Sequence, residues 1–145
     1  FRCAFGRFQG VHVTGLLLDT HVALWAVSVP SNLRPDVAAR LVGGEFAVYF
    51  SLASAWELAI KSSRGKIRLP MDVYRFTEAI VEQLGAEWLS ISLDHVARVE
   101  SFPFHHADPF DRLLVAQALC NDLTLVTADD ALREYGAKIL PARGP

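Results

Sequence analysis

Short hydrophobic runs alternate along the chain with longer segments in which apolar residues recur at helical spacing. The runs that predict strands cover residues 14–18, 46–50, 88–91, 123–126 and 138–140. The segments that predict helices cover residues 20–27, 35–42, 51 or 54 to 64, 73–84, 93–100, 109–119 and a last stretch ending at 135. Because helices separate the strands, the pattern predicts an α/β domain with a parallel sheet and right-handed crossovers.

The first 12 residues, FRCAFGRFQGVH, differ from the rest of the chain. They show no apolar period, no helix-capping signal and none of the features of a signal peptide. We therefore expect residues 1–12 to form an extension that is disordered or non-native. Residues 13–145 are expected to form a single domain, since a chain of this length can bury one substantial core.

Composition excludes several classes of protein. Hydrophobic residues make up 52 % of the 145 residues, which argues against disorder, and the net charge of −2 argues against nucleic-acid binding through bulk charge. Cys3 and Cys120 show neither a CxxC pair nor zinc-like spacing, which predicts a reducing compartment rather than a disulfide framework. No apolar run reaches the roughly 18 residues that a membrane span requires. A cytoplasmic protein is expected.

Carboxylates occur at corresponding places in four separate segments. Asp19 follows the first predicted strand, Glu57 lies on the helix after the second, Asp111 opens the helix before the fourth, and Asp129 follows that strand. Strand ends and helix starts meet at one edge of a parallel sheet, where ligands bind. Four crowded carboxylates repel one another unless cations lie between them, and Mg²⁺ or Mn²⁺ suits such oxygen ligands. These four residues, the acid cluster, therefore predict a divalent-metal site, in which two ions about 3.5–4 Å apart would clamp a phosphodiester.

Helix capping is the alternative explanation for each acid. Asp19 could cap the helix that starts at Thr20, and residues 54–57 form a capping-box pattern, with Glu57 also spaced for an ion pair with Lys61. The remaining candidates for capping roles are Asp108 and Asp111 at one helix, and Asp129 or Asp130 at another.

Other polar residues near these segments leave several interpretations open. His105 and His106 are interpreted as loop residues that contact substrate or support Asp108, rather than as zinc ligands, and His21 as a supporting or packed residue. A basic cluster downstream of Glu57 fits either charge at a helix C-terminus or contact with phosphates; it consists of Lys61, Arg64, Lys66 and Arg68. The three tryptophans are interpreted as core or interface anchors; they are Trp25, Trp56 and Trp88.

Four segments, LLLDTHVALW, SAWELAIKSSRGKIRLP, FHHADPFDRLLVAQAL and LTLVTAD, resemble the motifs of PIN-domain ribonucleases, in particular the VapC toxins of type II toxin–antitoxin pairs. The similarity runs from about residue 14 to 140. It implies a three-layer α/β/α domain with a central parallel sheet of about five strands. It also implies a Mg²⁺- or Mn²⁺-dependent endoribonuclease, a homodimer, an RNA substrate and a VapB antitoxin as partner.

By the same resemblance, Asp19, Glu57, Asp111 and Asp129 match the family's four acids, with Asp130 offering an alternative register for the fourth. The first three would hold a primary metal, and Asp129 would assist a second metal or a water molecule.

Four further residues are expected in supporting roles. Thr20 and Thr127 would orient carboxylates or water, Asp108 would assist, and Arg112 or the basic cluster would hold the substrate backbone.

Two other functions are weighed against the nuclease. A phosphotransfer domain would need an Asp in place of His21 or of Ser51, so the sequence argues against it. A catalytically silent PIN-like scaffold that binds RNA or protein would be expected to lack an acid, and all four are present.

Overall fold

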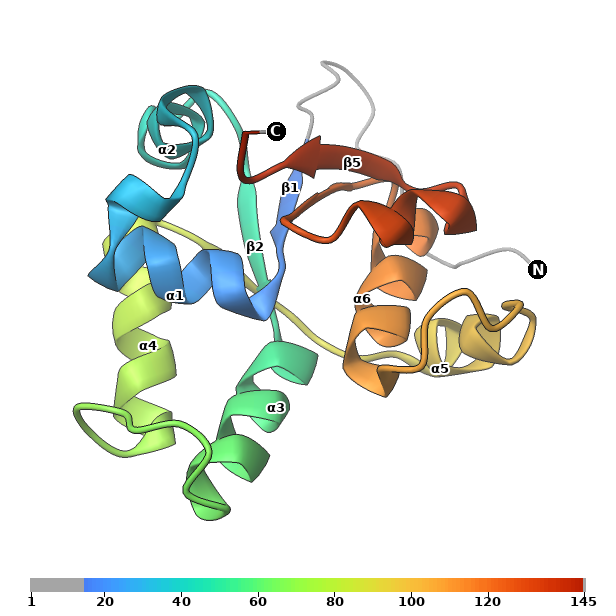
Figure 1. Cartoon of the computed structure of the whole chain (residues 1–145), viewed down its shortest axis with the longest axis horizontal. Helices are drawn as coiled ribbons and strands as arrows, with labels where there is room; N and C mark the ends of the chain where they lie inside the picture. Colours follow the sequence, from blue (N-terminus) through green and yellow to red (C-terminus); the bar gives the residue numbers. More distant parts are fainter. Residues whose placement is uncertain (1–14, 145) are drawn as a thin grey trace.

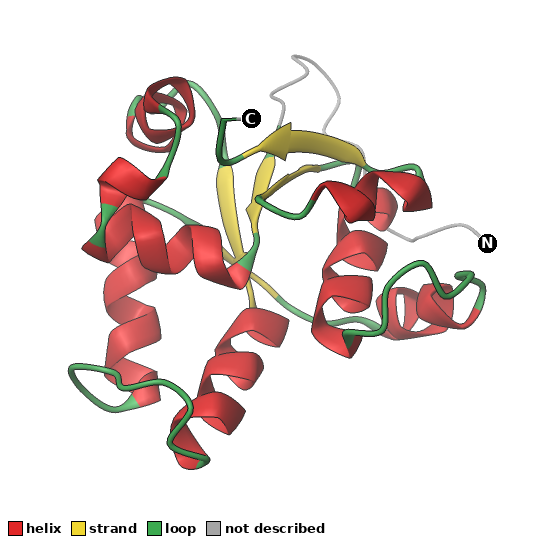
Figure 2. Ribbon diagram, viewed as in Figure 1, coloured by secondary structure: helices red, strands yellow, loops and turns green. Residues whose placement is uncertain are grey.

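The computed structural model describes residues 15–144. Five parallel strands form one sheet in the order β3-β2-β1-β4-β5 (Figure 2). Their bounds are Leu16–Leu18 for β1, Val48–Ser51 for β2, Glu87–Leu89 for β3, Thr124–Thr127 for β4 and Lys138–Pro141 for β5. The predicted extension and Cys3 lie outside the described residues, so the predictions made for them stay predictions.

The helices pack on both faces of this sheet, α1, α2 and α4 on one and α5 and α6 on the other (Figure 1). Their bounds are Thr20–Ser28 for α1, Pro35–Val42 for α2, Leu52–Ser63 for α3, Val73–Leu84 for α4, Leu93–Glu100 for α5 and Pro109–Cys120 for α6. Two short 3₁₀ helices, η1 (Pro30–Asn32) and η2 (Asp130–Tyr135), complete the described elements. The predicted three-layer α/β/α fold is confirmed.

Strand alternation explains the two cores. In β1, Leu16 and Leu18 point into the core beneath α1, α2 and α4, whereas Leu17 points into the core beneath α5 and α6. All three side chains are buried, as expected for a central strand covered on both faces.

The strand order reverses next to β1. The chain builds β1, β2 and β3 outward in one direction and then returns to add β4 and β5 on the other side of β1. In open parallel sheets such a reversal leaves a crevice at the carboxyl ends of the two strands that flank it, here β1 and β4. The fold therefore provides a site where Asp19 and Asp129 emerge.

Several predicted boundaries shift in the structure. The N-cap of α3 is Ser51, whose hydroxyl accepts a hydrogen bond from the Ala53 amide at 3.0 Å, so the capping box predicted at residues 54–57 is wrong. The last predicted helix is the 3₁₀ helix η2, and β3 is displaced toward its N-terminus relative to the predicted 88–91.

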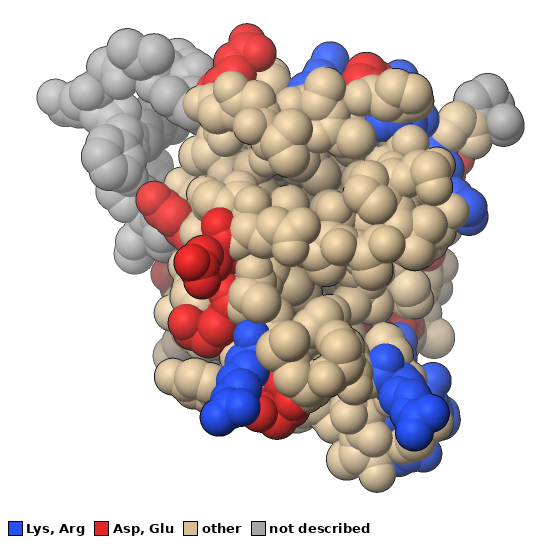
Figure 3. All heavy atoms as spheres, turned by 90° about the vertical axis from the view of Figure 1, so that its left-hand side faces the viewer, with Lys and Arg blue, Asp and Glu red and all other residues tan. Residues whose placement is uncertain are grey.

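The face formed by α1, α2 and α4 has an uncharged centre, with Lys and Arg gathered toward its upper and lower ends (Figure 3). The lower end is where the connection between α3 and α4 runs in Figure 1. Among residues 15–144, no helix is long and apolar enough to cross a lipid bilayer.

Candidate metal centre

The four predicted acids come from four elements that meet at the carboxyl edge of the sheet. Asp19 directly follows β1, Asp129 lies just beyond β4, Glu57 lies in α3, and Asp111 lies in the first turn of α6. Asp19 is 8 % exposed and Glu57 only 3 %, which is unusual for carboxylates without a strong partner. Burial disfavours the ionised form of Asp19.

Asp19 is held by a partner on β4 rather than by the helix it precedes. Although Asp19 occupies the N-cap position of α1, its side chain makes no capping hydrogen bond. Its Oδ2 instead accepts a hydrogen bond from the Thr127 hydroxyl at 2.7 Å, and the Thr127 oxygen accepts one from the Asp129 amide at 3.1 Å. Thr127 thus connects two members of the acid cluster, and capping does not explain Asp19.

Glu57 is likewise held by a threonine hydroxyl, that of Thr20 at the start of α1. Its Oε1 accepts a 2.6 Å hydrogen bond from the Thr20 hydroxyl, whose oxygen lies 2.9 Å from the Ser54 hydroxyl. Because a carboxylate only accepts and Thr20 has one proton, Ser54 donates to Thr20 and Thr20 donates to Glu57. The other oxygen, Oε2, accepts from Lys61 Nζ at 2.6 Å, as the spacing of the two residues along the helix predicted.

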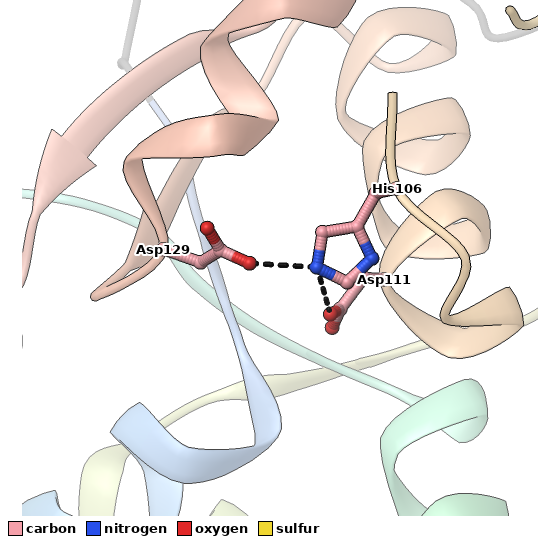
Figure 4. Close-up of side chains that lie close together, drawn as sticks. All are labelled: His106, Asp111 and Asp129. Carbon is pink, nitrogen blue, oxygen red and sulfur yellow. Dashed lines mark hydrogen bonds and ion pairs between the residues drawn. The ribbon is translucent and has the colours of Figure 1, made fainter. Parts of the chain in front are cut away.

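His106 lies between the two remaining acids (Figure 4). Its Nε2 is 2.7 Å from Asp129 Oδ2 and 3.4 Å from Asp111 Oδ2. Its Nδ1 accepts a hydrogen bond from the Asp108 amide at 3.1 Å. An amide can only donate, so Nδ1 carries no proton and Nε2 carries one. In this arrangement His106 is a donor to the two carboxylates and not a metal ligand.

Asp108 serves as the N-cap of α6. Its Oδ1 accepts hydrogen bonds from the Phe110 amide at 2.8 Å and the Asp111 amide at 3.4 Å. These bonds fix the first turn of the helix and thereby the position of Asp111. The capping role predicted for Asp108 is confirmed, whereas Asp111 itself makes no capping bond. Asp129 does cap η2, through Oδ1 and the Ala131 amide at 3.0 Å, and keeps Oδ2 for His106.

The buried acids and their neighbours shift one another's pKa values. Burial raises the pKa of Asp111 to about 7, with further contributions from the negative charges of Asp19, Asp108 and Glu57, against which His106 acts in the lowering direction. Burial likewise raises the pKa of Asp19, and the hydrogen bond from Thr127 offsets part of that effect. The hydrogen bond to Glu57 raises the pKa of Lys61, and the charges of Asp108 and Asp111 act in the same direction. The site has more negative charge than its own cations balance.

This donor set fits a hard divalent cation. Among the described residues, one ligand atom each of Asp111, Asp129 and His106 lies within 4.8 Å of the other two, and the predicted acids Asp19 and Glu57 are outside this group. Thr127 joins Asp19 to the Asp129 backbone. Oxygen ligands of this kind suit Mg²⁺ or Mn²⁺, and a bound cation would remove the penalty that raises the pKa of Asp111 and Asp19. A zinc site is disfavoured, because neither histidine offers a free ring nitrogen to the cluster: His105 faces Glu134 at 3.1 Å.

Arg112 has a different place from the one predicted. It is 6 % exposed, and its guanidinium donates to the backbone carbonyls of Pro103 at 3.0 Å and of Phe102 and Val99 at 3.3 Å. It also lies 4.5 Å above the ring of Phe104. Arg112 therefore organises the loop that carries His106 and is not available to contact a substrate backbone.

Sequence reasoning did not connect His106 with Asp129. The two residues are 23 positions apart, and no periodicity relates a loop histidine to the end of a later strand. The sequence does contain one local signal, since His106 stands two residues before the cap Asp108, at the distance that lets its ring meet the Asp108 amide.

The protein-family comparison matches the PIN domain over residues 16–138. Ribonuclease VapC22 of Mycobacterium tuberculosis is 32 % identical over 126 residues, which cover 85 % of this chain and 93 % of that protein.

Solved structures share the fold at lower sequence identity. VapBC2 from Rickettsia felis, bound to a DNA fragment from its promoter, matches with a TM-score of 0.67 and 14 % identity, over 88 % of this chain and 98 % of the other. DNA-bound VapBC from Salmonella typhimurium matches with a TM-score of 0.62 and 13 % identity, over the same shares of the two chains. The family match, the curated relative and the converging acids agree: the chain belongs to the PIN-domain family and, within it, to the VapC proteins.

Proposed function

We propose that the protein is a Mg²⁺- or Mn²⁺-dependent endoribonuclease toxin that hydrolyses phosphodiester bonds of RNA. The observation that carries this proposal is the convergence of Asp19, Glu57, Asp111 and Asp129 at one sheet edge, with hydroxyl donors fixing two of them. The similarity to a protein named as a ribonuclease supports the reaction class.

A bound divalent ion would supply Lewis-acid stabilisation of the phosphoryl oxygens and would lower the pKa of a water molecule. Asp19, Glu57 and Asp111 would hold the primary ion, while Asp129 would hold a second ion or orient water. Thr20 and Thr127 keep the buried carboxylates in fixed orientations, which limits the reorganisation needed when substrate binds. His106 fixes the orientation of Asp129 relative to Asp111.

The proposed hydrolysis of an RNA phosphodiester consumes one water molecule and needs no other co-reactant. The water oxygen forms a bond to phosphorus, the bond from phosphorus to the ribose 3′ oxygen breaks, and that oxygen receives a proton. The products are one fragment with a 3′-hydroxyl and one with a 5′-phosphate. In-line attack of this kind requires the phosphate to be positioned at the acid cluster, since little covalent chemistry is left to the protein.

The proposed partners follow from the related complexes. The solved neighbours are VapBC assemblies, which supports a VapB-like antitoxin that neutralises the protein, and the family suggests a homodimer in the cytoplasm. An antitoxin could inhibit by placing a cationic side chain among the four acids, whose charge exceeds that of the surrounding cations.

A catalytically silent PIN-like scaffold is the second candidate. It would be favoured by the loss of an acid or of a residue that orients one, and the described residues include all four acids and the two hydroxyls that orient Glu57 and Asp19. The phosphotransfer alternative is weaker still, because Ser51 is fully buried as the cap of α3 and His21 is exposed.

The test is cleavage of RNA by purified protein free of antitoxin, with Mg²⁺, with Mn²⁺ and with EDTA. We expect metal-dependent cutting that Asp19→Asn lowers by at least about 100-fold, the range typical for loss of an essential electrostatic group. Asp122→Asn, which changes an exposed carboxylate paired with Lys138, is the matched control and should cut normally. Equal cutting in EDTA, or normal cutting by a folded Asp19→Asn protein, would refute the proposal.

A further inference from the structure

A pocket of about 450 Å³ opens beside the acid cluster, between the C-terminal half of α3 and the start of α6. Its lining includes the acids Glu57 and Asp108 and the basic residues Lys61, Arg64 and Lys66. Its volume falls within the range of pockets that hold a small ligand. The pocket is therefore continuous with the proposed catalytic centre and large enough for a group the size of a nucleotide.

The basic side chains are ordered along the helix, leading away from the acids. Glu57, Lys61 and Arg64 are spaced by four and three residues, which places them on one face of α3, and Lys66 follows in the turn after the helix. At a rise of 1.5 Å per residue, Arg64 lies about 10 Å beyond Glu57 along the axis. A chain whose phosphate lies at the acids would meet Arg64 and Lys66 within a short distance.

Two of the basic side chains that line this pocket are not paired with an acid of the described chain. Lys61 is engaged by Glu57 at 2.6 Å, and the Asp108 carboxylate is engaged in capping α6. Arg64 and Lys66 are exposed, and within residues 15–144 neither side chain forms an ion pair or hydrogen bond with an acid, unlike Arg34, Arg75 and Lys138. The part of the pocket that Arg64 and Lys66 line is therefore suited to an anion.

One aromatic ring lines the pocket, and a second ring packs against it from outside the lining. Phe110 lines the pocket, and Trp56 packs edge-on against it with ring centres 5.1 Å apart and planes at 78°. Trp56 is 57 % exposed, so it does not belong to the core, and its role as an interface anchor stays a prediction. An exposed indole beside a basic track is an arrangement that binds unpaired nucleotides, because every base has a face that can stack.

We propose that this pocket holds a nucleotide of an unpaired RNA strand adjacent to the bond that is cut. Arg64 and Lys66 contact its phosphates, and the Trp56–Phe110 pair contacts its base. The substrate is accordingly single-stranded at this position, since a base stacked within a duplex cannot reach an aromatic side chain. The assignment of RNA rests on the proposed function, but binding can be measured without cleavage.

The test measures the anisotropy of a fluorescein-labelled RNA octamer with full-length protein in EDTA, over a salt series. We expect Arg64→Ala/Lys66→Ala to weaken binding about 10-fold and to reduce the slope of log affinity against log salt by about 1.4, as loss of two single-strand phosphate contacts predicts. Trp56→Ala should weaken binding about 5- to 100-fold. Arg40→Ala/Lys138→Ala, two exposed cations on α2 and β5, removes the same charge elsewhere and should bind normally.

Several results would overturn the subsite. These are no binding by the wild-type protein, unchanged affinity of the Arg64/Lys66 variant, an equal loss in the control variant, and equally tight binding of blunt double-stranded RNA. Octaglutamate that binds as tightly as the octamer and also requires Arg64 would assign the pocket to an acidic peptide instead. If the subsite variants lose binding but the wild-type protein fails to cut RNA with either Mg²⁺ or Mn²⁺, the subsite stands and the nuclease proposal fails.

Discussion

Single hydroxyl groups determine how the acidic side chains are held. Thr20 and Thr127 each donate to a buried carboxylate, at 2.6 Å to Glu57 and at 2.7 Å to Asp19. Each hydroxyl also accepts a hydrogen bond from a group on another part of the site, so its orientation is fixed. The expectation that these two threonines orient carboxylates is consistent with these hydrogen bonds.

The titration of Asp111 makes a prediction for the metal-free protein. Its pKa is about 7 in the folded chain and 3.8 when unperturbed, so between about pH 4 and 7 the folded state binds more protons than the unfolded state. The free energy of unfolding must then decrease as pH rises through this window. We expect the melting temperature of the wild-type protein in EDTA to fall from pH 5 to pH 8. The melting temperature of Asp111→Asn should fall less steeply over the same range.

Asp122→Asn is the control for this measurement, because it removes an exposed carboxylate and should keep the wild-type slope. If the melting temperature of Asp111→Asn depended on pH as steeply as that of the wild type, this would contradict the claim that burial and acidic neighbours raise the pKa of Asp111.

The sequence predicts the position of a side chain where that residue directly follows a strand or begins a helix. Asp19 and Asp129 come just after strands, and Asp111 opens a helix, so their common edge could be predicted from the alternation of elements. Arg112 could not be placed in this way. Its burial depends on how the loop 101–107 folds back over α6, and a charged residue in the first turn of a helix gives no sign of that contact.

At the scale of elements, the junction between β2 and α3 determines where Glu57 lies. The Ser51 hydroxyl accepts from the Ala53 amide and donates to Gln117 Oε1 on α6 at 2.6 Å, and it is fully buried. One hydroxyl therefore starts α3 and joins it to the helix that carries Asp111. This hydrogen bond links the N-terminus of α3, which carries Glu57, to α6, which carries Asp111.

Ser51→Ala is expected to lower the free energy of unfolding by about 2–3 kcal/mol, of which about 1 is the lost cap and the rest is the buried Gln117 oxygen left without a donor. Chemical denaturation measures the change. In a Gln117→Leu background the same substitution should cost only about 1 kcal/mol, because the orphaned oxygen is gone. Ser63→Ala, at an exposed hydroxyl near the end of α3, is the control. A cost for Ser51→Ala equal to that of Ser63→Ala would contradict this role.

The elements themselves were largely predictable, and the errors have local causes. The bounds of α2, α4 and α5 and the cap Asp108 match the apolar period and capping signals. The start of α3 was left open between Ser51 and Ser54, because the SAWE sequence imitates a capping box while the helix has already begun. Residues 130–135 form a 3₁₀ helix with one buried side chain, Leu132, and six residues are too few for their apolar spacing to distinguish this from an α-helix.

At the scale of the whole molecule, the order of strands concentrates the chemistry. With β1 central and the order reversing beside it, the residues that follow β1 and β4 lie near Glu57 of α3 and Asp111 of α6. The parallel sheet was predictable from alternation, whereas the position of β1 between β2 and β4 was not, because local sequence does not state which strands pair. That pairing brings residues 19 and 127 together across 108 positions of the chain.

The central claim is that acids from four separate elements form one divalent-metal site, and calorimetric titration with Mn²⁺ tests it most directly. We expect the metal-free wild-type protein to bind Mn²⁺ at pH 7.5, and Asp19→Asn, Glu57→Gln, Asp111→Asn and Asp129→Asn each to weaken binding by at least about 10-fold. Asp122→Asn should bind as the wild type does. Failure of the folded wild-type protein to bind Mn²⁺, or full affinity in the Asp19 and Asp111 variants, would contradict the claim.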